Sequence, residues 1–200
     1  MKCATSVLCT LLILCQIIGR SLELSHDFVP ISEEILSKCE DKPEMGYLDE
    51  FADFSHFIRK RSSSGINISG NITTKWDVSP SDIVEVDVTI LKLEGNKWKP
   101  TAFKGNVNDL CKSFYDKNTI YYPYTTQHVV NRKTVKEKCI NTPGTTLLLE
   151  PFVLKISFSY AVPLSVGRHK AVLVFSAIDK AGVKRPRDTC LEIVGDIVNA

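Results

Sequence analysis

Residues 66–76 show the most regular alternation of apolar and polar side chains in the chain. One face carries Ile66, Ile68, Ile72, Thr74 and Trp76, and the polar side chains between them form the other face. A repeat of two residues with a single apolar face predicts a β-strand that covers a core on one side only.

A second strand is predicted from Val84 onward, where valines and Ile90 alternate with polar residues. The alternation changes phase at residues 91–93, which predicts a β-bulge. Residues 94–97 predict a hairpin turn, and the chain returns from Trp98. Because Glu85 and Asp87 alternate on the polar face, we interpret them as solvated surface and not as a catalytic acid pair.

Further strands are predicted at residues 51–61, 145–159, 168–178 and 184–198, with Pro151 as a break or an edge position. Residues 108–115 form the only clear helix, with Asn108 or Asp109 as its cap. Short strands, frequent turns and one short helix predict an all-β protein, an antiparallel β-sandwich. Two such sheets pack about 10 Å apart, and if they splay, an apolar cavity lies between them.

The first twenty residues differ from the rest of the chain. Lys2 is followed by a nearly continuous apolar run at residues 7–18 and then by Gly19. This order predicts a signal peptide at residues 1–20, and a retained membrane anchor is the less favoured interpretation because the run is short. We therefore expect a secreted, extracellular protein with a lead-in segment at residues 21–46 and a sandwich domain at residues 47–200.

Cysteine usage agrees with export. Three of the seven cysteines precede residue 20, and Cys39, Cys111, Cys139 and Cys190 follow it. These four cysteines allow three pairings, of which we favour Cys111–Cys139 with Cys39–Cys190. No C-x-x-C motif follows residue 20, which argues against a zinc site and against redox chemistry.

Two N-glycosylation sequons lie on the polar face of the first predicted strand, at Asn67 and Asn71. We expect at least one to be occupied, although two ordinary exposed asparagines are the alternative. Arg59, Lys60 and Arg61 precede a serine-rich turn, and we favour a charged strand end over a processing site.

An aromatic loop follows the predicted helix. Phe114, Tyr115, Tyr121, Tyr122 and Tyr124 fall within eleven residues. Tyrosines suit the mouth of a ligand pocket because each has an apolar body and a polar tip, but the same rings can simply pack the loop onto the sandwich. His128 is a possible ligand contact, and a hydrogen-bonded structural role is the favoured interpretation.

Little in the chain supports catalysis, a cofactor or a metal. No H-x-x-x-H pair, nucleophile elbow or glycine-rich phosphate loop is present. Removal of residues 1–20 takes away Lys2 and Arg20, which leaves 23 basic and 23 acidic residues. A balanced charge argues against nucleic-acid binding, which depends on phosphate neutralisation.

Residues 167–170, 189–193 and 195–197 resemble the end of ganglioside-activator-like proteins of the ML lipid-recognition superfamily. Residues 71–77, 109–111 and 122–124 resemble more specifically a group of secreted insect proteins related to chemosensory accessory proteins. The resemblance implies an immunoglobulin-like sandwich whose sheets part to admit a lipid or similar hydrophobe. The presence of only four cysteines after residue 20 argues against glycolipid presentation in particular.

These expectations combine into a non-catalytic carrier or presenter of a hydrophobic small molecule or lipid. An extracellular interaction module without a cavity, docking on a receptor or another secreted protein, is the alternative. Tyr121, Tyr122 and Tyr124 are expected to contact the ligand. The other expected lining residues, each of which is equally consistent with dry core, are Val86, Val88, Ile90, Phe103, Leu110, Phe114, Phe152, Ile156, Phe158, Val172 and Val174.

Overall fold

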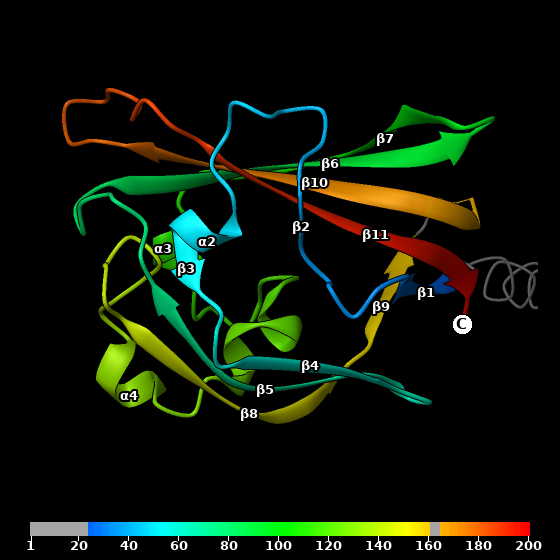
Figure 1. Cartoon of the computed structure of the whole chain (residues 1–200), viewed down its shortest axis with the longest axis horizontal. Coiled ribbons are helices and arrows are strands. Elements are labelled where there is room, and N and C mark those ends of the chain that lie inside the picture. Colours follow the sequence, from blue (N-terminus) through cyan, green and yellow to red (C-terminus); the bar gives the residue numbers. More distant parts are fainter. Residues whose placement is uncertain (1–23, 161–164) are drawn as a thin grey trace, which may run out of the picture.

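The computed structural model describes residues 24–160 and 165–200, so the expected signal peptide lies outside the described residues. The described chain forms two antiparallel β-sheets that face each other as a sandwich, with little helix (Figure 1). This confirms the predicted fold class. We call them the large sheet and the small sheet.

The large sheet has the order β7 (Lys97–Val107), β6 (Ile83–Glu94), β10 (Gly167–Ile178), β11 (Thr189–Asn199), β1 (Leu24–Pro30) and β9 (Ile156–Tyr160). A two-residue strand, β2 (Ser37–Lys38), also pairs with β11. The longest uninterrupted pairing joins β6 to β10, from Ile83↔Ile178 to Lys92↔His169. This ladder forms the centre of the upper layer in Figure 1.

The small sheet is built around β5 (Gly65–Thr74), which pairs with β4 (Phe57–Ser62), β8 (Thr146–Leu154) and the short β3 (Ala52–Asp53). Ile66, Ile68 and Thr74 are buried while Asn67 is exposed, which confirms the predicted alternation. The β5–β8 register shifts between Ile68 and Gly70, opposite the segment of β8 that contains Pro151. Pro151 therefore lies at a bulge, where a missing N–H is tolerated.

The phase change at residues 91–93 has a different cause from the one predicted. β6 pairs with β10 without interruption there, and the irregularity lies in β7, between the pairs Thr89↔Lys104 and Leu91↔Pro100. The Thr101 hydroxyl donates to the carbonyl of Ile90 at 2.8 Å and accepts from the Phe103 N–H at 3.1 Å, so it bonds the backbone at the bulge. The apolar residues change face because this end of β6 is half-buried on both faces.

Three one-turn helices connect the strands: α2 (Leu48–Phe51), α3 (Leu110–Ser113) and α4 (Arg132–Val135). α3 confirms the predicted helix in shortened form, and the Asp109 side chain caps it by accepting from the Lys112 N–H at 3.2 Å. α2 and α4 were not predicted, because a single turn is too short to show a 3.6-residue period.

The expected lead-in segment is part of the sheet. From residue 24 onward it supplies β1, which pairs with both β11 and β9, and β2. Sequence reasoning missed β1 because its inward positions include His26 and Pro30 where a strand pattern calls for aliphatic residues.

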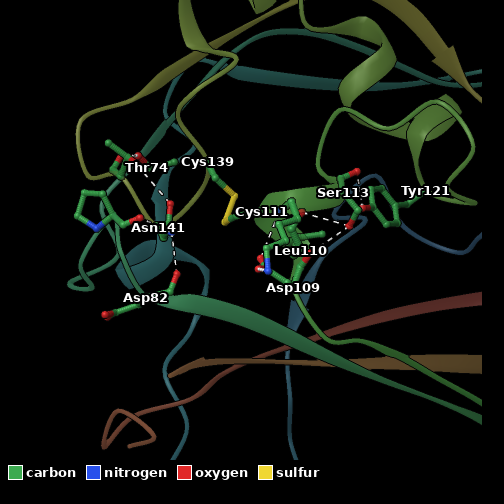
Figure 2. Close-up of a disulfide and its surroundings, with 12 residues drawn as sticks. Thr74, Asp82, Asp109, Leu110, Cys111, Ser113, Tyr121, Cys139 and Asn141 are labelled. Carbon is green, nitrogen blue, oxygen red and sulfur yellow. Dashed lines mark hydrogen bonds and ion pairs between the residues drawn. A yellow bond between two sulfur atoms is a disulfide. The ribbon is translucent and has the colours of Figure 1, made fainter. Parts of the chain in front are cut away.

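One end of the sandwich, at the left in Figure 1, is pinned by buried polar contacts; we call it the closed end. The buried Asn141 amide donates to the carbonyls of Pro80 and Asp82, just before β6 of the large sheet. The Thr74 hydroxyl, at the end of β5 of the small sheet, donates to the Thr142 carbonyl at 2.6 Å. Figure 2 shows Asp82, Asn141 and Thr74 in this arrangement, with the loop of residues 139–145 joining the two sheets.

The side chain of Asp82 also joins the closed end to Arg185, which lies in the connection between β10 and β11. Its buried carboxylate accepts two hydrogen bonds from the Arg185 guanidinium, at 2.8 and 3.0 Å, and one from the Ser79 N–H at 3.0 Å. The bonds from Arg185, followed by that from Ser79, lower the pKa of Asp82 below its ordinary range against the opposing effect of burial.

We predict that Asp82→Asn destabilises the protein at pH 7 and that the difference from the wild type disappears in acid. A depressed folded-state pKa gives a stabilisation that is complete above the unfolded-state pKa of about 3.9 and is lost as the pH falls through the folded-state value. Urea unfolding of both proteins at several pH values checks this. A stability difference that stays constant down to pH 2 contradicts it.

Candidate ligand site between the sheets

Burial along the inner face of the large sheet changes with distance from the closed end. On β6, Val84 and Val86 are buried, but Val88 and Ile90, which follow them on the same face, are half-buried. On β10, Ala177 and Phe175 are buried, while their successors toward residue 169, Leu173 and Ala171, are half-buried. The registers place these residues directly across from one another, Val88 beside Leu173 and Ile90 beside Ala171.

The same change occurs on β11, where Leu191 is buried and Ile193, paired with Ala171, is half-buried. We call the half-buried set Val88, Ile90, Ala171, Leu173 and Ile193 the central strip. Beyond it, His169 and Ile197 are buried again. Apolar side chains on the inner face of a sandwich are normally sealed from solvent, so the central strip marks where the two layers are least tightly packed.

The buried core is correspondingly divided. A large cluster at the closed end contains Phe51, Trp76, Val86 and Phe175 among its members. A smaller cluster consists of Ile35, Ile66, Ile68 and Leu154, with Tyr124, Phe152, Ile156 and Ile193 packed around it. Two of the central strip residues, Val88 and Leu173, contact the large cluster, and Ile193 contacts the small one.

Eight of the fourteen expected lining residues lie in or against the two clusters: Val86, Val88, Leu110, Phe114, Tyr121, Tyr124, Phe152 and Ile156. Val86, Leu110 and Phe114 are buried in the large cluster. The half-buried members of the expected set are Val88, Ile90, Phe103, Tyr121, Tyr122, Tyr124, Phe152, Ile156 and Phe158.

Val172 and Val174 are placed elsewhere. They pair with Thr89 and Asp87 of β6 and with Glu192 and Cys190 of β11, which puts them on the outer face of the large sheet. They therefore do not face the space between the sheets. β10 carries apolar residues on both faces, so hydrophobicity could not decide which set points inward.

The aromatic loop forms a wall between the sheets; we call residues 114–130 the tyrosine segment. It contains two short 3₁₀ turns, η1 (Tyr122–Tyr124) and η2 (Thr126–His128). It runs beside β8, with the Val130 N–H donating to the Leu148 carbonyl at 2.9 Å. In Figure 1 its green turns lie between the two layers.

The hydroxyls of Tyr121, Tyr122 and Tyr124 in this segment each have a protein partner. Tyr121 donates to the Ser113 carbonyl at 2.8 Å, and Tyr124 donates to the carbonyl of Ser157 in β9 of the large sheet. The Tyr122 hydroxyl accepts from Arg132 at 2.7 Å. The segment thus connects β8 to β9, and its rings are held in fixed positions.

His128 has the structural role favoured from the sequence. Its Nδ1 lies 3.0 Å from a Glu150 carboxylate oxygen, and its Nε2 lies 3.1 Å from the Pro123 carbonyl. The ring stacks on Phe152, with 3.7 Å between the ring centroids. Both nitrogens are therefore engaged in holding the tyrosine segment against β8.

Both favoured disulfides are present, Cys111–Cys139 and Cys39–Cys190. The first joins α3 to the loop of the closed end and so fixes the start of the tyrosine segment (Figure 2). The second lies on the outer face of the large sheet and ties residues 39–46 to β11.

A buried ion pair on that outer face was not predicted. The Lys170 ammonium lies 2.9 Å from a Glu192 carboxylate oxygen, and both side chains are nearly inaccessible. The ammonium also lies 5.1 Å from the centroid of the Trp98 ring and 3.5 Å from Asp41. No sequence signal finds such a pair, because Lys170 and Glu192 are on different strands and a lysine normally indicates surface.

Pockets lie at two places on the surface of the described residues, both away from the central strip. One, of about 220 Å³, lies at the end opposite the closed end and has Phe28, Ile66 and Leu154 in its lining, so it borders the small cluster. The other, of about 270 Å³, lies beside α2 and includes Tyr47 and Phe54. None of the expected lining residues contributes to either pocket.

No group of three or more metal-ligating side chains is assembled among residues 24–160 and 165–200. Within the same residues, no helix has the length and hydrophobicity that a membrane crossing requires. No protein-family model matches the chain, and no curated protein is a significant match.

We predict that replacing Cys111 and Cys139 together by alanine lowers the free energy of unfolding by about 3–4 kcal/mol, because the bond closes a loop of 28 residues in the unfolded chain. Denaturant unfolding of the full chain checks the value. Asp109→Ala, which removes only the helix cap, is a local control and should cost about 1 kcal/mol. A double cysteine variant no less stable than that control contradicts the role given to the disulfide.

Proposed function

We propose that this protein is a secreted, non-catalytic carrier of a hydrophobic small molecule or lipid, which it holds against the central strip. The observation that carries the proposal is the half-burial of five apolar side chains in the middle of the inner face. These residues lie between regions of the same face that are fully buried. Covering them with an apolar guest contributes about 25 cal/mol for each Å² removed from water, before the cost of ordering the ligand.

Four further observations support the proposal. The tyrosine segment supplies a rigid, partly apolar wall beside the strip. The pocket at the end opposite the closed end has two residues of the small cluster, Ile66 and Leu154, in its lining, so it borders the apolar interior. The sequence resemblance to ML-type proteins points to the same class of ligand. Two disulfides are compatible with the oxidising environment of a secreted protein.

A second candidate is an extracellular docking module that uses the tyrosine segment. The observation in its favour is the exposure of two large apolar side chains on that segment, Ile120 at 67% and Val130 at 59%. On this account the central strip serves only as loosely packed core.

We predict that Ala171→Phe abolishes uptake of a fluorescent apolar probe such as N-phenylnaphthylamine while the melting temperature stays close to that of the wild type. Ala171 lies on the inner face between Ile90 and Ile193, so a phenyl ring there occupies the space of the guest. Thr89→Phe, on the outer face of the neighbouring strand, is the matched control and should leave uptake unchanged.

Three outcomes contradict the carrier. A wild-type protein that takes up no probe and yields no hydrophobe on solvent extraction and mass spectrometry is one. Unchanged probe uptake by Ala171→Phe is another. The third is a loss of stability of 1–3 kcal/mol on that substitution, since overpacking a closed core has that cost.

We also propose that Asn67 and Asn71 carry N-glycans on the outer face of the small sheet. Across β5, Asn67 is paired with Val153 and Asn71 with Leu148, both exposed, so a glycan covers an apolar neighbour. We predict that glycosidase treatment lowers the mass of the secreted protein and that Thr73→Ala removes one glycan. Thr73→Ser keeps the sequon and should retain it. An unchanged mass on glycosidase treatment contradicts the proposal.

A further inference from the structure

A buried histidine stands at the end of the central strip with one unused nitrogen. His169 precedes Ala171 on the inner face of β10, and only 1% of its surface is exposed. Its Nδ1 lies 2.9 Å from the Gly167 carbonyl. Its Nε2 is buried and has no hydrogen-bond partner among the described residues. Leaving a buried polar atom unbonded is costly, and such an atom calls for an explanation.

His169 lies on the same inner face of the large sheet as the central strip. Its neighbours in the register are Lys92 on β6 and Gly195 on β11. Gly195 is required by packing, because a Cβ there would overlap the ring of Phe28. One step further along the same face come Ile90, Ala171 and Ile193, three members of the central strip.

The hydrogen bond at Nδ1 decides what Nε2 can do. A carbonyl oxygen only accepts, so the proton of the ring lies on Nδ1. In a neutral imidazole the other nitrogen is then an acceptor. A molecule that satisfies Nε2 must therefore donate a hydrogen bond to it.

We propose that His169 is the polar anchor of the ligand site and that the ligand is an apolar molecule with a hydroxyl group, which donates to Nε2 while its hydrocarbon part covers the central strip. The inference rests on the proposed carrier function and specifies its ligand class. The inference predicts that alcohols bind more tightly than ethers and esters of the same size, because ethers and esters have no proton to donate.

The test compares 1-dodecanol with its methyl ether by competition against the fluorescent probe, using the full secreted chain. The alcohol should bind about five to ten times more tightly, the value of one net hydrogen bond. In protein with ¹⁵N-labelled histidine, the alcohol should shift the Nε2 resonance of His169 and the ether should not.

Two variants separate the anchor from its surroundings. His169→Asn keeps an amide that can donate to the Gly167 carbonyl but has no atom at the Nε2 position, so it should bind both compounds equally. Thr145→Val is the matched control, because the Thr145 hydroxyl is also buried without a partner in the described residues but lies in the loop of the closed end. That variant should retain the preference for the alcohol.

The possible failures are distinguishable. If neither compound binds the wild type, the carrier function itself is wrong. If both bind with equal affinity and the Nε2 resonance does not move, the carrier function stands and the anchor is overturned. The ¹⁵N measurement needs only the wild-type protein, so it decides the matter even when His169→Asn does not fold.

Discussion

The interior of this protein depends on the polar contacts that pin the two sheets at one end. The buried side chains of Asn141 and Thr74 join the loop of residues 139–145 to the two sheets, and Arg185 holds the buried Asp82 carboxylate beside them. Separating the layers there would leave several polar groups without partners. The closed end is therefore the least adaptable part of the sandwich. At the central strip the inner-face side chains are apolar and their contacts are non-directional, so the layers can stand further apart there at a lower cost.

The tyrosine segment lowers the cost of separating the two layers, because it shields part of the apolar interior from water. Its start is fixed by the Cys111–Cys139 disulfide, and Tyr124 bonds to β9 at its far side. Phe152 is covered by the His128 ring. The segment thus shields part of the apolar interior without filling the middle of the inner face, where the central strip remains half-buried. A single buried nitrogen on His169 at the edge of that strip gives an otherwise apolar surface one point of polar recognition.

The sequence predicted the sandwich well where one face of a strand is polar. β5 shows its inward set clearly because Asn67 and Asn71 alternate with isoleucines. The prediction from sequence failed on strands whose two faces do not differ in polarity. β10 is apolar on both faces, so Val172 and Val174 were assigned to the wrong one, and β1 was missed because His26 and Pro30 replace aliphatic residues.

Only part of the candidate site could be predicted from the sequence, because some of its features depend on how the strands pack and not on residue type. The aromatic loop and both disulfides are local or countable features, and they were found. The half-burial of the central strip depends on how the two sheets are spaced, and the unbonded Nε2 of His169 depends on which polar groups the fold places around the ring. A pattern of residue types predicts neither the spacing of two sheets nor the lack of a hydrogen-bond partner at a buried atom. The Lys170–Glu192 pair was missed on the same grounds.

The central claim is that the middle of the inner face receives an apolar guest while the closed end does not. Isotope-filtered nuclear Overhauser measurements between methyl-labelled protein and an unlabelled medium-chain alcohol test it most directly. We expect contacts from the alkyl chain to the methyl groups of Val88, Ile90 and Leu173 and none to Val84. Contacts confined to surface side chains such as Ile120, or no contacts at all, would contradict the account.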